Sequence, residues 1–124
     1  MTTALLLVAA LLSFVVGLAH SVLGEKYILM RLFRRPDLPK LFGDMTFTAR
    51  TLRFAWHLTT IAWWGGGAML VLASRGLLSQ RNSLIVLAAT MLATAAVILV
   101  ASRGRHLAWP VFLAIAVISL WAAT

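Results

Sequence analysis

The sequence predicts an all-α integral membrane protein, an antiparallel four-helix bundle that forms a single domain over residues 1–124. Three observations predict this fold class. The chain is 62% hydrophobic and 11% charged, whereas a soluble domain is about 45–50% apolar and about 25% charged. Four stretches are apolar over roughly the 20 residues that a membrane-spanning helix needs. The basic residues behind the net charge of +8 lie between these stretches or at their edges.

The four expected spans cover about residues 3–24, 52–74, 82–102 and 106–123. Each should be an α-helix, because lipid offers no water to backbone polar groups. Short connections then make consecutive helices antiparallel neighbours. The first span could instead be a secretory signal with a cleavage site near residues 17–19. We favour a retained helix, because the three residues at the start carry no positive side chain, which a signal sequence requires.

The basic residues indicate how the spans are oriented. Seven of the eleven Lys and Arg residues lie in the first connection, about residues 25–51, or at its border with the second span. The third connection lies on the same side of a four-span protein and adds two more. The positive-inside rule therefore predicts a multi-pass protein of the cell (inner) membrane, with this connection cytoplasmic and both termini outside. The nine residues are Lys26, Arg31, Arg34, Arg35, Lys40, Arg50, Arg53, Arg103 and Arg105.

The first connection should contain helix on both sides of a break. Residues 26–35 alternate apolar and basic side chains, which favours an amphipathic continuation of the first helix. Pro36 and Pro39 should end it, since proline removes a backbone donor and disfavours helix before it. Asp44 can then cap a helix that begins near Met45 and runs into the second span.

Three histidines, His20, His57 and His106, are expected at the cytoplasmic ends of their spans, close to Glu25. Three interpretations remain open. The rings could solvate and pack the helix ends. They could form a metal site with an oxygen ligand from Glu25 or Asp44. They could line a porphyrin or quinone pocket, in which His20 and His57 would be the axial ligands of a haem.

A second candidate site follows one face of the second span. Arg53, His57, Thr60 and Trp64 recur at intervals of four, three and four residues, so they share a helix face. One interpretation is a polar seam that hydrogen-bonds to a neighbouring helix. The other is a ligand slot open to the cytoplasmic leaflet, in which Arg50 and Arg53 engage an anionic or carbonyl group.

Two tryptophans are followed directly by three glycines in the second span. Trp63 and Trp64 fall near its middle, away from the interfaces that tryptophan prefers, so packing must explain them. The glycines at residues 65–67 follow at once and favour close approach of another helix, with the Ala-rich third span as the expected partner.

Composition also narrows the function. The chain has no cysteine and only three acidic residues, none at the centre of a span, which argues against thiol chemistry and a carboxylate proton relay. No hydrolase motif and no nucleic-acid-binding pattern is present. We therefore expect a small integral-membrane binding or accessory subunit, with lipids and a second copy or a larger membrane complex as partners. The alternative is a membrane redox or metal-dependent enzyme component that uses the three histidines as metal or haem ligands.

Overall fold

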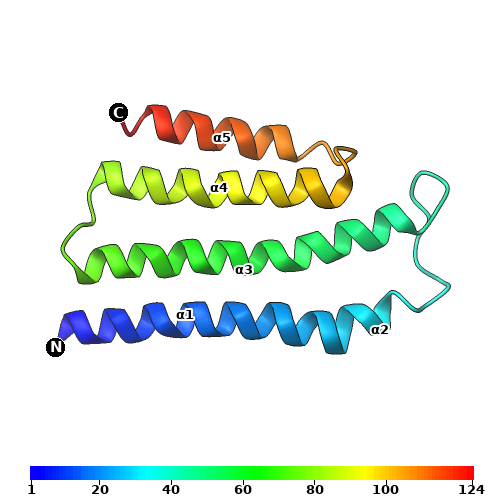
Figure 1. Ribbon diagram of the computed structural model, residues 1–124, viewed down its shortest axis with the longest axis horizontal. Coiled ribbons are helices and arrows are strands. Elements are labelled where there is room, and N and C mark those ends of the chain that lie inside the picture. Colours follow the sequence, from blue (N-terminus) through cyan, green and yellow to red (C-terminus); the bar gives the residue numbers. More distant parts are fainter.

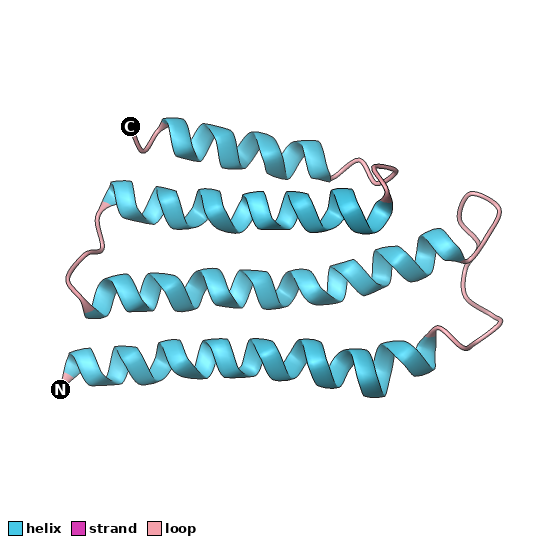
Figure 2. Ribbon diagram, in the orientation of Figure 1, coloured by secondary structure: helices cyan, strands magenta, loops and turns pink.

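The computed structural model describes residues 1–124 and contains four long helices and no strands (Figure 2). The first helix continues without a break to Leu32, through a π-helical segment and a last short turn. The elements are α1 (Thr2–Gly24), the π-helical segment (Glu25–Leu29), α2 (Met30–Leu32), α3 (Thr46–Ser74), α4 (Gln80–Ser102) and α5 (Trp109–Trp121).

The four long helices lie side by side in one open layer, in chain order (Figure 1). α1 packs on α3, α3 on α4 and α4 on α5, and consecutive helices are antiparallel. The closed bundle that the sequence predicted is not confirmed, because α1 and α5 lie at opposite edges of the layer (Figure 1). Short connections make neighbours of consecutive helices, but no feature of the hydropathy pattern requires the first helix to meet the last.

Small residues at seven-residue intervals bring the helices together. A seven-residue repeat keeps one narrow stripe of a helix facing its partner, and small side chains let the two backbones approach. Three of the four helices bury such a stripe. The stripes are Ala10, Gly17 and Gly24 in α1, Thr60, Gly67 and Ser74 in α3, and Ala88, Ala95 and Ser102 in α4.

The apolar residues are mostly exposed. Only 17 of the 124 residues are buried, and leucine, valine and isoleucine side chains cover the outside of α1 and α5. Two helices, Thr2–Leu32 and Gln80–Ser102, are long and apolar enough to cross a membrane, by length and composition alone. α3 has the length, but its polar face lowers its hydropathy.

α5 is shorter than the expected fourth span of about residues 106–123. It has 13 residues and begins at Trp109. Pro110 explains this start, because proline is tolerated in the first turn of a helix but excludes a helical turn before it. His106 and Leu107 consequently belong to the connection from α4.

The connection from α2 to α3 has the predicted elbow. Arg35 donates two hydrogen bonds to the Asp37 carboxylate, at 2.9 and 2.7 Å, and so clasps Pro36 between them. A tight turn follows, with positive φ angles at Phe42 and Gly43. The Asp44 carboxylate then accepts a hydrogen bond from the Thr46 backbone N–H at 2.8 Å. The prediction that Asp44 caps this helix is therefore confirmed.

Candidate functional site

Polar side chains join the first helix to α3 between Ser13 and Glu25 on one side and Arg53 and Trp64 on the other. Eight side-chain hydrogen bonds cross this interface, whereas none crosses between α3 and α4 or between α4 and α5. Five of these bonds reach backbone carbonyls, including Trp64 Nε1 to Phe14 O and Thr60 Oγ1 to Gly17 O. The face of α3 that carries Arg53, His57, Thr60 and Trp64 is thus a seam with α1.

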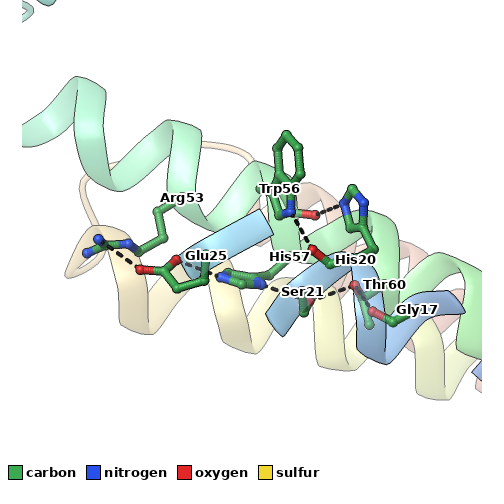
Figure 3. Close-up of polar contacts among 8 residues, drawn as sticks. All are labelled: Gly17, His20, Ser21, Glu25, Arg53, Trp56, His57 and Thr60. Carbon is green, nitrogen blue, oxygen red and sulfur yellow. Dashed lines mark hydrogen bonds and ion pairs between the residues drawn. The ribbon is translucent and has the colours of Figure 1, made fainter. Parts of the chain in front are cut away.

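Glu25 is the acidic centre of this seam. One carboxylate oxygen, Oε1, lies 3.0 Å from Arg53 Nη2, and the other, Oε2, lies 3.3 Å from His57 Nε2 (Figure 3). Its side chain is 32% exposed, so the ion pair lies at the border between the helix interface and the surroundings. Glu25 is also the first residue of the π-helical segment. π-Helical segments are rare in proteins, and those that occur often lie at functional sites.

A chain of hydroxyl groups continues from His57 into the interface. Ser21 Oγ lies 2.8 Å from His57 Nδ1 and 2.7 Å from Thr60 Oγ1, and Thr60 can donate to the Gly17 carbonyl at 3.0 Å (Figure 3). With a neutral His57, Thr60 donates to Ser21, Ser21 to Nδ1, and Nε2–H to Glu25. With a charged His57, both hydroxyls turn and the last proton goes to Gly17 O. The links from Glu25 through His57 and Ser21 to Thr60 are therefore kept in either state, whereas the bond from Thr60 to Gly17 O forms only with a charged His57.

Ser21, His57 and Glu25 have the residue types of a hydrolase triad, but the surroundings differ from one. A hydrolase also needs free backbone N–H groups beside the serine, to stabilise the oxyanion. Ser21 lies inside the continuous helix that ends at Leu32, where the neighbouring N–H groups are bonded within the helix. The contact with Thr60 occupies a second side of its hydroxyl. The Ser21–His57–Glu25 contacts therefore lack the free backbone donors of a hydrolase triad.

His20 belongs to a separate pair on the other side of the seam. His20 Nε2 lies 3.2 Å from the Trp56 carbonyl, and Trp56 Nε1 donates to the His20 carbonyl at 3.0 Å. The two rings are stacked, with centroids 4.5 Å apart and an interplanar angle of 2°. Gly24 makes room for the indole, because a Cβ at that position would overlap Trp56.

The three histidines lie at the same end of the molecule, but they do not share a site. His106 packs against Phe47 and Phe54 of α3, with ring centroids 6.1 and 5.2 Å away. Of the predicted metal ligands His20, His57, His106 and Glu25, the structure brings only His57 and Glu25 into contact. No three His, Asp or Glu side chains are grouped so that they could hold a metal ion. The facing His20 and His57 rings expected of a haem site are likewise not seen, since each ring faces different partners.

The predicted ligand-binding residues also divide into two groups. His57, Thr60 and Trp64 contact α1, so their polar atoms are engaged within the protein. Arg50 and Arg53 line a hollow of about 310 Å³ at the start of α3. The other lining residues are Phe33, Leu38, Met45, Thr46 and Ala49. Arg53 is held there by Glu25 and by the Phe33 ring, 4.9 Å from its guanidinium carbon, whereas Arg50 has no acidic partner.

The glycines at residues 65–67 serve different neighbours. Gly65 approaches Thr90 of α4, which matches the expected contact with the third span, and Gly67 approaches Phe14 of α1. Gly66 has nothing within 4 Å. Trp63 and Trp64, as expected near mid-span, are explained by packing: Trp63 meets the His20 ring at 5.0 Å, and Trp64 donates to α1.

Sequence reasoning missed Ser21 and Trp56. A usable signal was present, because Gly17, Ser21 and Glu25 recur every four residues and therefore share one face of α1. That face complements the one formed by Arg53, His57 and Thr60. Trp56 has no such signal, since its role depends on the space that Gly24 leaves on the partner helix.

Comparisons with protein-family models, with curated protein sequences and with solved structures found no match for this chain.

Proposed function

We propose that this protein is a small integral-membrane binding protein that holds an anionic, phosphate-bearing lipid headgroup at the cytoplasmic membrane boundary. The hollow beside Arg50 and Arg53 carries the proposal. It combines two guanidinium groups with the apolar walls that the upper part of an acyl chain would contact. Guanidinium groups bind phosphate through paired, charge-assisted hydrogen bonds.

The membrane location rests on exposed apolar surface. Leucine and valine side chains of α1 are about half exposed, for example Leu11 at 60% and Val15 at 54%. Lipid is the medium in which such a surface is stable. In this proposal all four long helices cross the bilayer, both termini are outside, and the connection between α2 and α3 is cytoplasmic. The short α5 is accommodated by local thinning of the bilayer.

Glu25 has the role of a positioning residue in this proposal. It fixes the guanidinium of Arg53 from one side, and the seam fixes Glu25 through His57. The side chain of Arg53 thereby loses less conformational freedom when a ligand binds. Arg50, which has no carboxylate partner, provides the uncompensated positive charge. The hollow is therefore cationic although it contains an ion pair at its edge.

The test is the preference for anionic lipid in a reconstituted bilayer. Spin-labelled phosphatidylglycerol and phosphatidylcholine are compared for the fraction that the protein immobilises. Wild type should prefer phosphatidylglycerol, and the Arg50→Ala/Arg53→Ala double variant should lose about tenfold in relative affinity, as expected for lost charge-assisted hydrogen bonds.

The matched control is Arg31→Ala/Arg34→Ala, which removes the same charge from two exposed positions that do not line the hollow. It should retain most of the preference. An equal loss in both double variants would mean that the preference comes from total charge, and the proposed site would be wrong.

A further inference from the structure

A second hollow lies on the surface at the α1–α3 seam, on the side occupied by His20. Its volume is about 450 Å³, within the range of about 300–1,000 Å³ that small-molecule pockets show. Aromatic and aliphatic side chains form its walls. The residues that matter here are Val16, His20, Leu23, Tyr27, Trp56 and Trp63.

The hydrogen bond to Trp56 decides which nitrogen of His20 carries a proton. A backbone carbonyl can only accept, so His20 Nε2, 3.2 Å from Trp56 O, must be the donor. In the neutral ring the other nitrogen, Nδ1, is then a lone-pair acceptor. No hydrogen bond within the protein uses it. His20 Nδ1 is also accessible. Thr51 Oγ1 is the only side-chain polar atom that is both buried and without a hydrogen-bond partner, so Nδ1, which has no partner, is not buried.

The ring of His20 is held rigidly in this position. It stacks on Trp56 at 4.5 Å, and the edge of Trp63 lies against it at 5.0 Å. The reciprocal bonds between His20 and Trp56 fix both backbones as well as both rings. A ligand that binds Nδ1 therefore meets an acceptor that is already oriented, which lowers the entropic cost of binding.

We propose that this hollow binds a hydroquinone-type amphiphile from the bilayer, whose phenolic O–H donates to His20 Nδ1. The acceptor requires a ligand with a hydroxyl donor. The indoles of Trp56 and Trp63 and the ring of Tyr27 favour a planar aromatic group, because aromatic rings gain from offset or edge contacts with one another. The exposed Leu23 and Ile28 belong to its lining, so an alkyl tail that follows them can continue into lipid.

This site is independent of the proposed anionic site. The two hollows have no lining residue in common, and Arg50 and Arg53 do not contact His20. Loss of phosphatidylglycerol binding in the arginine variants would therefore leave this proposal intact, and the reverse also holds.

The test uses the full chain in lipid nanodiscs and a fluorinated hydroquinone with a short alkyl tail, followed by fluorine NMR under anaerobic conditions. The same molecule with both hydroxyls methylated is the matched ligand. Wild type should bind the hydroquinone about tenfold more tightly than the ether, which is the value of roughly one net hydrogen bond. Equal binding of the two ligands would overturn the proposal, because simple partitioning into an apolar groove would explain it.

Protein variants give a second readout. His20→Phe should lower hydroquinone affinity to that of the ether and leave the ether unchanged. Val16→Trp, which places a much larger side chain in the hollow, should abolish specific binding of both ligands. His106→Phe is the control, since its ring packs on Phe47 and Phe54, and it should change neither affinity. Retention of tight hydroquinone binding in both His20→Phe and Val16→Trp would overturn the site.

A third ligand tests the chemical class. An aliphatic alcohol with the same tail offers the hydroxyl without the aromatic ring, so it should bind more weakly than the hydroquinone. Binding as tight as that of the hydroquinone would contradict the assignment of an aromatic ligand.

Discussion

At the scale of single residues, the α1–α3 seam depends on what glycine allows opposite it. Trp56 lies over Gly24, and Trp64 and Thr60 lie over Gly17. Each indole donates a hydrogen bond to an α1 carbonyl as well as packing on it. Glycine on one helix and tryptophan on the other therefore act as complementary halves of one contact. Interhelical hydrogen bonds in membranes contribute about 0.6 kcal/mol each on average, so close packing must accompany them.

Two glycine substitutions separate this contact from general helix propensity. Gly24→Ala should lower the free energy of unfolding by about 1–3 kcal/mol, because its methyl group overlaps Trp56 and overpacking costs about that much. Gly66→Ala meets nothing within 4 Å and should raise stability by about 0.5–1 kcal/mol. Unfolding in mixed micelles measures both. A similar effect of the two variants would contradict the role given to Gly24.

Residue spacing along a helix determines which site residues could be predicted. The face of Arg53, His57, Thr60 and Trp64 could be read from spacing alone, and of its two interpretations the seam is the one that the contacts match. Spacing gives a face, however, and not the partner that the face meets. Whether His20, His57 and His106 share a site depends on helix rotation, which hydropathy does not determine. His20 and His57 belong to the same helix pair, yet each meets different partners across the seam.

At the scale of elements, the π-helical segment follows the part of the first helix that packs on α3. Residues before it, such as Gly24, contact α3, and Leu29 within it is buried. A π-helical turn contains one residue more than the α-helical register needs. The segment thus places Glu25 toward Arg53 and His57 at the cost of a less regular helix.

Deletion of Ile28, an exposed residue of this segment, tests the idea. The shortened segment can close into an α-helix, so we expect thermal stability to stay equal or to rise. The direction of the Glu25 side chain relative to Arg53 would change, so the preference for phosphatidylglycerol should fall. A less stable protein with an unchanged lipid preference would show that the π-helical segment serves packing alone.

The elbow between α2 and α3 gives a prediction about pH. The hydrogen bonds from the Arg35 guanidinium hold the pKa of the Asp37 carboxyl below its ordinary value. A carboxyl whose pKa is lowered by folding stabilises the fold when ionised. This contribution is present at neutral pH and is lost as the pH falls through the folded-state pKa. The same contact raises the pKa of Arg35.

Carbon NMR of the Asp37 carboxyl measures this effect. Its titration midpoint should be lower in wild type than in the Arg35→Ala variant, because the variant lacks the guanidinium that donates to the Asp37 carboxylate. Arg34→Ala, which removes a neighbouring charge without a contact to Asp37, should leave the midpoint close to that of wild type. Identical midpoints in wild type and Arg35→Ala would contradict the clasp.

The ends of the helices illustrate what local chemistry can predict. Pro36, Asp44 and Pro110 act within a few residues of themselves, so the elbow and the cap of α3 followed directly from the sequence. The same rule applied to Pro110 predicts the start of α5 near Trp109, but the expected span of about residues 106–123 was set by hydropathy alone. The π-helical segment had no local signal in the sequence.

At the scale of the whole molecule, the open layer consists of a polar pair and an apolar pair of helices. α1 and α3 share the hydrogen-bonded seam, whereas α4 and α5 pack through small residues such as Ala88, Ala95 and Ala116. Between the pairs, hollows of about 400 and 360 Å³ share Gly65, Val86 and Thr90. Helix number and antiparallel order could be predicted from hydropathy and connection lengths. The open layer could not, because it depends on which side chains meet across the helices.

The proposed topology, in which four helices cross the membrane with the Glu25–Arg53 end on the cytoplasmic side, can be tested by labelling single cysteines. The chain has no cysteine, so single cysteines can report topology without background. The positions are Thr3, Leu41, Leu78, Leu107 and Thr124, one in each terminus and connection. A membrane-impermeant maleimide should label positions 3, 78 and 124 in intact cells, and positions 41 and 107 only after permeabilisation. Labelling of position 41 in intact cells, or opposite results for positions 3 and 124, would contradict the account.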